Sequence, residues 1–336
     1  MTKAKVLRVG VVGCGYFGEK HASVFHSLAN TQLMAVCDTN KAQADALAAR
    51  LGCNAYASVE EMLQKEELDA CSVAVSEQYH LTAAAPILKA KKHLLIEKPI
   101  AQNAAEGQEL LQLAQENGVR LMVGQILKFD PKYQTLAERI AAGELGAITN
   151  MYLKRTSTNG VPQRLNGAVS MYHYMGVHDF EAMLTFAGGA KVKRVYTQGV
   201  SQVNAPYNSA DATLNTITFD NGCIACIHLC WSLPNDALGL VTCAHVVGTK
   251  GVGYVDIHSP GLAIYGSGST VEYPEMTYWP EANGEIQGAL RAELAHFADC
   301  TLHEKPYIVD SARALEAVRV IDACRESLKT GQPVEL

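Results

Sequence analysis

A lysine that can exchange a proton with a hydroxyl group follows the apolar run 93–96. It is Lys98, and it stands between Glu97 and Pro99. A lysine at the end of a buried strand can hold a substrate hydroxyl, and desolvation lowers its pKa toward neutrality. We therefore interpret Lys98 as a candidate acid or base. The alternative is a surface lysine paired with Glu97.

A second group of candidate side chains lies in the segment YHYMGVHDFE. Tyr174 and His178 are four residues apart, so they share one face of a helix, with Glu181 one turn further on that side. Histidine exchanges protons near neutral pH, and a phenol can hydrogen-bond to it or to a substrate. We expect these two side chains to act together. His173 and Asp179 are interpreted as supporting or surface groups.

A glycine pattern near the start of the chain is typical of a phosphate-binding turn. The apolar run 6–12 leads into GCGYFG at 13–18. Gly13 permits a tight turn, Gly15 lets the backbone approach phosphates, and Gly18 lets helix and strand pack closely. The N–H groups at the helix start attract negative charge. The pattern predicts a pyrophosphate site that includes Tyr16 and Phe17.

A carboxylate at the end of the second apolar run indicates which dinucleotide binds. This residue is Asp38, twenty residues after Gly18. A carboxylate there accepts hydrogen bonds from both ribose hydroxyls and repels a 2′-phosphate. We therefore expect NAD as the cofactor, with NADP as the alternative because Lys41 nearby tolerates a phosphate. Further residues assigned to the cofactor site are Ser76, Glu77, His80, Glu97 and Lys98.

The elements that position these residues alternate between strands and helices in the first part of the chain. Expected strands are 6–12, 33–37, 54–56, 70–75, 93–96 and 120–124. Expected helices are 15–29, 41–51, 59–65, 80–89 and 104–117. Alternation of this kind predicts a Rossmann domain, a doubly wound parallel sheet. We place this domain at residues 1–125.

The pattern changes after residue 125. A helix at 131–142, a strand at 148–157, a polar loop at 158–169 and a helix at 171–187 are expected. From 192 to 273, strands are separated by Asn-Gly, Gly-Thr-Lys-Gly and Ser-Pro-Gly turns, which predicts an open, mostly antiparallel sheet. Helices at 286–302 and 311–330 follow. We expect a second α/β domain at 126–310 and a C-terminal helix and tail at 311–336.

Length and charge narrow the class of protein. A chain of 336 residues is long enough for two cores, and its net charge of −6 argues against a nucleic-acid partner. No run of about 20 apolar residues suggests a membrane span. The spacing of the ten cysteines offers no complete metal motif. We expect a cytoplasmic protein with reduced thiols.

Three of these cysteines, Cys223, Cys226 and Cys230, lie close enough together to suggest metal ligands. The second half of a zinc motif is missing. As a strand of period two, this segment places Cys226, His228 and Cys230 on one face together with Ile224. We therefore expect a structural sheet surface and no metal.

Five motifs in order resemble the family of glucose–fructose oxidoreductase, inositol dehydrogenase and the rhizopine catabolism protein. They are Gly13 to Gly18, Asp38, Glu97-Lys98-Pro99, Gly176-x-His178 and Gly331-Gln332-Pro333-Val334. The resemblance covers essentially the whole chain. It implies hydride transfer between a nicotinamide ring and a secondary alcohol of a sugar, cyclitol or sugar derivative. It also implies a homodimer or homotetramer formed through the second sheet.

By this resemblance Lys98 contacts the reacting oxygen, and the alcohol sits between Lys98 and His178. Members of the family place an Asp four residues before the helix histidine, where this chain has Tyr174. A phenol carries no charge near neutral pH. We therefore assign proton transfer to Lys98 and His178 jointly and positioning to Tyr174, with a Tyr174–Lys98 acid pair as the alternative. Ser76-Glu77-Gln78 also differs from the usual Pro-Asn turn.

Substrate specificity is expected from basic residues in the second domain. Lys154 and Arg155 end a strand, and Arg164 follows in the loop. Together with Lys98, Tyr174 and His178 they are the expected substrate contacts. The alternative for each is a solvent-exposed charge. Aromatic residues that could wall the substrate site are Tyr152, Tyr172, Trp231 and Trp279.

Two other functions are compatible with the sequence. One is a regulatory protein that binds NAD(H) without turnover, which the Tyr174 replacement favours. The other is an oxidoreductase or glycosidase that retains its cofactor through oxidation and re-reduction. Lys98 and His178 favour the dehydrogenase over the regulatory protein.

Overall fold

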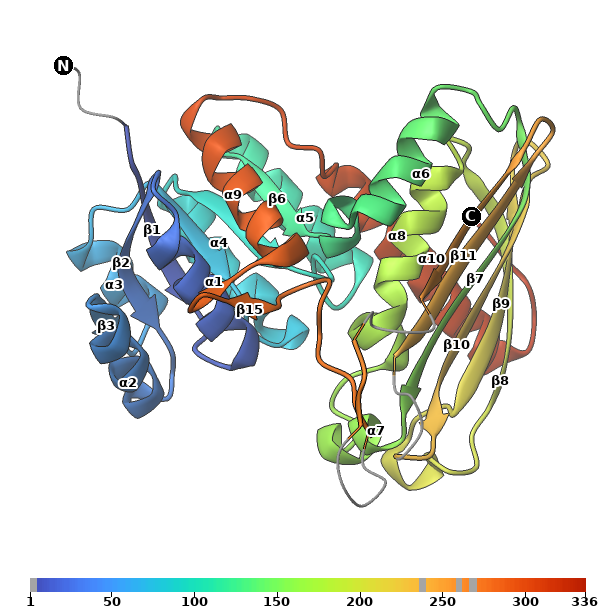
Figure 1. The fold of residues 1–336 in the computed structure, drawn as a ribbon, viewed down its shortest axis with the longest axis horizontal. Helices are drawn as coiled ribbons and strands as arrows, with labels where there is room; N and C mark the ends of the chain where they lie inside the picture. Colours follow the sequence, from blue (N-terminus) through green and yellow to red (C-terminus); the bar gives the residue numbers. More distant parts are fainter. Residues whose placement is uncertain (1–4, 236–239, 258–261, 266–270) are drawn as a thin grey trace. The chain divides into compact units, whose positions relative to one another are not determined.

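The computed structural model describes residues 5–235, 240–257, 262–265 and 271–336. The chain forms two compact units (Figure 1). Unit 1 holds residues 1–129 and 275–315, and unit 2 holds residues 130–274 and 316–336. Unit 1 therefore includes a late segment, 275–310, which the sequence pattern assigned to the second domain. None of the helices described has both the length and the apolar character needed to cross a bilayer.

Unit 1 is built on a six-stranded parallel sheet with the order β3-β2-β1-β4-β5-β6. This is the Rossmann order, and it confirms the predicted doubly wound sheet. Its strands are β1 (Leu7–Val12), β2 (Thr31–Cys37), β3 (Asn54–Tyr56), β4 (Ala70–Val73), β5 (His93–Glu97) and β6 (Leu121–Gly124).

The helices of unit 1 begin where side chains can cap them. Asn40, Ser58 and Asn103 each accept a hydrogen bond from the backbone N–H three residues further on. The helices are α1 (Tyr16–Ser27), α2 (Lys41–Leu51), α3 (Val59–Lys65), α4 (His80–Lys89), α5 (Ala104–Glu116) and α9 (Gly288–Leu302). Shorter elements are η1 (Glu77–Tyr79), η2 (Ile126–Phe129), β15 (Glu281–Ala282) and β16 (Glu285–Ile286).

Unit 2 is built on a seven-stranded sheet with the order β12-β11-β7-β10-β9-β8-β17. Among its described strands only β7 and β10 pair in parallel, so the sheet is mostly antiparallel, as predicted. The strands are β7 (Ile148–Thr158), β8 (Val192–Val200), β9 (Ala212–Phe219), β10 (Ile224–Leu233), β11 (Val241–Gly248), β12 (Val252–Ile257) and β17 (Val334–Glu335). A separate small sheet pairs β13 (Ile264–Tyr265) with β14 (Val271–Glu272).

The helices of unit 2 differ from the prediction in two places. The expected loop 158–169 contains α7 (Gly160–Leu165), and the expected helix 171–187 begins with a π-helical turn, η3 (Tyr172–Gly176), before α8 (Val177–Phe186). The other elements are α6 (Pro131–Ala141), η4 (Ala205–Tyr207) and α10 (Ser311–Thr330), the last from residue 316 onward.

One face of the seven-stranded sheet is buried and the other is not. Along β10, Ile227 and Leu229 are buried, whereas Cys226, His228 and Cys230 are half-exposed. Helix α8 packs against β7 and β10 on the buried face. The predicted Asn-Gly and Gly-Thr-Lys-Gly turns join β9 to β10 and β11 to β12. The expected Ser-Pro-Gly turn at 259–261 lies outside the described residues.

Candidate active site

The loop between β1 and α1 has the geometry that a pyrophosphate needs. Gly13 has a φ of +94°, which favours glycine. A Cβ at position 18 would lie 1.8 Å from the Gly13 carbonyl oxygen, so only glycine allows this contact. A Cβ at Gly15 would meet nothing within 4 Å. The loop is therefore closed on the protein side and open beside Gly15, where a phosphate approaches the start of α1.

Asp38 is fixed beside this loop by two backbone donors. Its carboxylate accepts a hydrogen bond from the Cys14 N–H at 2.7 Å and another from the Asn40 N–H at 2.8 Å. The Gln43 side chain also donates to the Cys14 carbonyl oxygen at 2.7 Å. The sequence pattern did not single out Gln43. These contacts hold the carboxylate at the end of β2, where a ribose would meet it.

A cavity of about 290 Å³ opens beside Asp38. Its volume is close to the lower limit for small-molecule pockets, and its lining is largely apolar, as an adenine ring requires. Lining residues are Val12, Gly13, Cys37, Asp38, Thr39, Ala57, Ser58, Val59, Glu60, Val75, Tyr79, Thr82 and Ala83. The glycine loop, the carboxylate and this cavity fit the adenosine and pyrophosphate of a dinucleotide.

The loop after β4 contributes to this cavity through other residues than expected. Val75 and Tyr79 line the cavity, whereas Ser76 and Glu77 are not among its lining residues. His80 is fully buried, and its ring nitrogens lie 2.8 Å from the Pro99 carbonyl oxygen and 3.1 Å from that of Val75. Burial lowers the pKa of His80. We therefore assign His80 to bracing two loops instead of touching the cofactor.

The end of β5 carries Lys98 next to an ionic pair in which His21 is fully buried and Glu97 is 12% exposed. The Glu97 carboxylate accepts hydrogen bonds from the Lys98 backbone N–H and from His21 Nε2, both at 3.1 Å. Burial raises the pKa of Glu97, but His21 and the Lys98 charge outweigh burial and hold it below its usual value. The Lys98–Pro99 peptide bond is cis. An ionised Glu97 is therefore bonded to the backbone of the candidate acid or base and interacts with its charge.

Aromatic side chains gather where α1 begins. The Trp279 ring meets the ring of Phe17 edge-on at 5.1 Å and that of Tyr16 at 6.5 Å. Tyr16 is 64% exposed. Trp279 was expected in the substrate wall of the second domain, but it belongs to unit 1 and packs on the phosphate loop. No local sequence signal joins Trp279 to this loop, because the two are far apart along the chain.

Tyr174 and His178 are singled out by their exposure. From Met171 to Leu184 they are the two half-buried residues, and all the others are buried. Glu181, expected on the same side, is buried and accepts a hydrogen bond from the Thr185 hydroxyl at 3.0 Å. The two candidate side chains therefore share an accessible face of this helix, and Glu181 does not.

Gly176 explains how the helix carrying these residues lies against the sheet. A Cβ at position 176 would fall 2.5 Å from the Cδ1 atom of Leu229 on β10. The helix backbone therefore approaches the sheet more closely than any other residue would allow. Gly176 ends the π-helical turn, so this close approach holds the Tyr174 and His178 segment in place.

The three basic residues expected to bind substrate lie in different places. Arg155 is buried and its guanidinium donates to the Asp179 carboxylate at 2.6 Å and 3.3 Å, which assigns it to an internal ion pair instead of a substrate contact. Lys154 points to the opposite face of β7, away from α8, because strand side chains alternate. Arg164 is exposed and donates to the Tyr174 hydroxyl at 3.3 Å. Only Arg164 joins the Tyr174 face.

Two of the aromatic residues expected to wall the substrate belong to the core. The Tyr172 hydroxyl is buried and donates to Asn215 at 2.8 Å. Trp231 is fully buried and donates to the Ala210 carbonyl oxygen at 2.6 Å, with its ring 6.3 Å from that of Tyr174. The buried Trp231 ring therefore packs against the Tyr174 ring from the core side.

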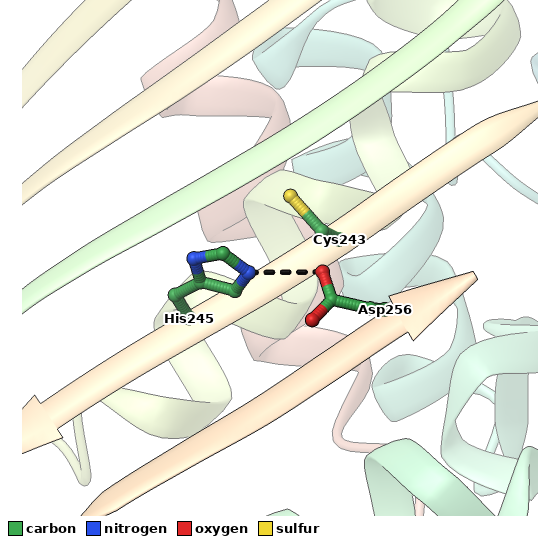
Figure 2. A group of neighbouring side chains, drawn as sticks. All are labelled: Cys243, His245 and Asp256. Carbon is green, nitrogen blue, oxygen red and sulfur yellow. Dashed lines mark hydrogen bonds and ion pairs between the residues drawn. The ribbon is translucent and has the colours of Figure 1, made fainter. Parts of the chain in front are cut away.

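The outer face of the seven-stranded sheet holds a group with metal-ligand chemistry (Figure 2). Ligand atoms of Cys243, His245 and Asp256 lie within 4.8 Å of one another. His245 Nε2 and the Asp256 carboxylate are hydrogen-bonded at 2.9 Å. A cation would displace this bond, and the nearby Lys154 charge acts on Cys243. We therefore assign the group to the sheet surface, in which Tyr152 packs on the His245 ring.

Comparison with known proteins identifies the family of both parts of the chain. Residues 7–125 match the model of an oxidoreductase family with an NAD-binding Rossmann fold, and residues 137–336 match its C-terminal alpha/beta domain. The scyllo-inositol 2-dehydrogenase (NAD(+)) of Bacillus subtilis (strain 168) is 26% identical over 98% of this chain and 96% of its own length. The uncharacterized oxidoreductase YrbE of the same organism is 26% identical over 100% and 98%.

A solved structure agrees with this assignment. GenD2 from gentamicin A biosynthesis, crystallised in complex with NAD, superposes with a TM-score of 0.87 at 22% identity, over 99% of this chain and 97% of its own. At this identity the likeness establishes the fold. The family models account for both the cofactor loop and the helix of His178, and the chain belongs to the Gfo/Idh/MocA family of NAD-binding oxidoreductases.

Proposed function

We propose that this protein is an NAD-dependent dehydrogenase that oxidises a secondary alcohol of a sugar, cyclitol or sugar derivative, and reduces the ketone in reverse. The observation that carries the proposal is the cradle around Asp38. Its carboxylate is held by two backbone N–H groups beside an open glycine loop. This arrangement suits a free ribose 2′-hydroxyl and favours NAD over NADP. The bound cofactor supplies the hydride acceptor.

The chain's own residues handle the proton. Lys98 holds the reacting hydroxyl and exchanges its proton, supported by the ionised Glu97 at the end of β5. His178 shares this proton transfer, because it is one of the two half-buried side chains between Met171 and Leu184. Tyr174, which receives a hydrogen bond from Arg164, positions the substrate with that guanidinium. The proposed catalytic residues are those that the sequence predicted. Lys154 and Arg155 are no longer included among the substrate contacts, nor His80 among the cofactor contacts.

The substrate class rests on similarity and on chemistry. A relative that matches nearly the whole chain is a scyllo-inositol 2-dehydrogenase. A polyol presents several hydroxyl groups, which suit the hydrogen-bonding groups of Arg164, Tyr174 and His178. A phenol in place of the family Asp leaves this face less negative. We therefore favour polyols that carry an additional anionic group among the cyclitols and sugars.

A cofactor-reduction screen tests the proposal. Purified protein is mixed with NAD+ or NADP+ and a panel of cyclitols, aldoses, uronic acids and glycosides, and reduced nicotinamide is followed by absorbance. We expect turnover with NAD+ that Lys98→Ala abolishes. Binding of NAD without turnover on any compound would favour the regulatory reading instead. Cofactor that remains bound through purification and cycles internally would favour the retained-cofactor reading.

We further propose a cytoplasmic homodimer or homotetramer. All ten cysteines lie in the described part of the chain and are free, which suits a reducing compartment. The open face of the seven-stranded sheet exposes Leu214, Ile224 and Tyr254. Exposed apolar side chains on one face of a sheet suit an interface between copies of the chain. Light scattering on wild type and Leu214→Asp tests this: we expect the variant to shift toward monomer.

A further inference from the structure

A carboxyl group without a hydrogen-bond partner is buried in unit 1, and the proposed mechanism does not use it. Glu293 lies on α9 and has no exposed surface. Neither of its side-chain oxygens has a hydrogen-bond partner among the described residues. An ionised carboxylate in such a place is strongly disfavoured, whereas a neutral carboxylic acid is tolerated far better.

The charge that acts on Glu293 is that of Glu97. His21, from α1, links Glu97 to the interior: its Nε2 donates to the Glu97 carboxylate at 3.1 Å, and its Nδ1 lies 2.8 Å from the Ser72 hydroxyl. Glu97 thus has donors from His21 and Lys98, and Glu293 has none. When two carboxyl groups interact strongly, only one of them is readily ionised. Here the ionised group is Glu97, because hydrogen-bond donors stabilise its charge.

No charged group on the described elements around Glu293 is hydrogen-bonded to its carboxyl group. Helix α9 packs against η2, α1 and β1. On β1, Arg8 is paired with Asp69 and Glu67. Lys128 on η2 is half-buried, and on α1, besides His21, Lys20 lies over the Tyr16 ring.

The remaining charged groups of α1 and α9 are engaged elsewhere or exposed. On α1, Glu19 is paired with Arg50, and His26 is exposed. On α9 itself, Arg291 is bonded to Ser27 and Glu285, Asp299 is paired with Lys305, and His296 accepts a hydrogen bond from the Ile308 N–H. Burial, together with the Glu97 charge, raises the pKa of Glu293 well above its usual value.

We propose that Glu293 is held as a neutral carboxylic acid against ionised Glu97, and that this buried pair sets the proton affinity of Lys98. A single negative charge at Glu97 stabilises the Lys98 ammonium. A second negative charge, at Glu293, would stabilise the ammonium form further and make Lys98 a poorer acid. Glu97 and Glu293 are positioning residues, since they act through Lys98. The effect on Lys98 rests on the proposed function, whereas the protonation of Glu293 does not.

Infrared spectroscopy of the full chain tests the protonation state without cofactor or substrate. At neutral pH, wild type should show the carbonyl stretch of an un-ionised carboxyl group that Glu293→Gln lacks. Glu106→Gln is the matched control, because Glu106 lies in the same unit and accepts hydrogen bonds from Gln102 and Asn103. The control should keep the band. A Glu293→Gln spectrum identical to wild type overturns the proposal.

The pH dependence of unfolding gives an independent readout. A carboxyl group whose folded pKa lies above the unfolded value of 4.5 makes the protein lose stability as pH rises from there to the folded pKa. The folding equilibrium constant of wild type should fall by up to about tenfold per pH unit across this window relative to Glu293→Gln. Parallel curves for the two proteins contradict the proposal.

Glu97→Gln tests the coupling and also serves if Glu293→Gln does not fold. Without the Glu97 charge, the Glu293 band should disappear at lower pH than in wild type. The limb of the activity profile that belongs to Lys98 should move about one unit toward acid, and Glu106→Gln should leave it in place. An active Glu97→Gln enzyme with an unmoved limb overturns the effect on Lys98. Absence of turnover in wild type instead counts against the proposed function and leaves the infrared test standing.

Discussion

The cofactor loop of unit 1 and the Tyr174 helix of unit 2 are built by different means. In the loop, backbone geometry makes the site: Gly13 and Gly18 touch through their backbones, and Asp38 is held by N–H groups. On the helix, side chains make it, and burial of their neighbours leaves Tyr174 and His178 accessible. A site made by the backbone allows few substitutions, whereas a site made by side chains can change its chemistry while the fold stays.

Two glycine substitutions in the cofactor loop should have very different effects on stability. Gly18→Ala places a Cβ against the Gly13 carbonyl, so we expect a loss of about 3 kcal/mol or more in unfolding free energy. Gly15→Ala meets no protein atom, so stability should change by less than about 1 kcal/mol. NAD affinity should still fall at least about tenfold, because the new methyl group occupies the phosphate side. Denaturant titration measures the unfolding free energy, and calorimetry measures the NAD affinity. Equal stability of the two variants would contradict the close contact between Gly13 and Gly18.

The buried ion pair of unit 2 gives the next largest effect. Arg155→Met leaves Asp179 as an unpaired buried charge and should cost about 3–5 kcal/mol of unfolding free energy. Lys154→Met, one residue earlier on the other face, should stay within about 0.5 kcal/mol. Chemical denaturation measures both. If Lys154→Met lost much unfolding free energy and Arg155→Met lost little, the assignment of these residues to the two faces of β7 would be wrong.

Cofactor preference tests whether the carboxylate of unit 1 selects the nucleotide. Asp38→Ser removes the charge that repels a 2′-phosphate, so the ratio of kcat/KM for NAD over NADP should fall at least about tenfold, which is about 1.4 kcal/mol. Steady-state kinetics with both cofactors measure it. Unchanged preference in a folded variant means that Asp38 does not read the ribose.

A smaller effect is expected on the helix of unit 2. Tyr174→Phe removes the hydrogen bond from Arg164 but keeps the ring against Trp231. We expect kcat/KM to fall by about fivefold, equivalent to about 1 kcal/mol, with NAD affinity unchanged. Arg164→Gln should give a similar loss, and the double variant should lose less than the sum. If the two losses in kcat/KM were fully additive, Tyr174 and Arg164 would act independently.

The smallest effect at neutral pH concerns a loop of unit 2. Asp211 accepts backbone N–H bonds from Gln202, Val203 and Asn204 at 2.6 to 2.9 Å. Burial raises the pKa of Asp211, but these donors outweigh it and hold the pKa below its usual 3.8. Its stabilisation is therefore complete above that value and is lost as the pH falls through the folded pKa. Thermal unfolding between neutral and acid pH should show a gap between wild type and Asp211→Asn that narrows in acid.

The sequence predicts local geometry better than it predicts which distant groups meet. Gly18 and Asp38 could be assigned because a tight turn and a strand end are set within a few residues. The alternation of Lys154 and Arg155 is also local, but the face that α8 covers is not, so their roles could not be separated. The Arg155–Asp179 pair, the Trp279 contact with the loop and the burial of Glu293 depend on segments far apart in the chain.

Isotope labelling shows whether this chain moves a hydride from the alcohol carbon to NAD+. A polyol identified by the screen is labelled with deuterium at the reacting carbon and mixed with NAD+ and the protein, and the reduced cofactor is analysed by mass spectrometry. We expect deuterium at C4 of the nicotinamide when wild type reacts, and none when Lys98→Ala replaces it. Reduced cofactor without deuterium, or labelled cofactor formed equally well by Lys98→Ala, would contradict this expectation.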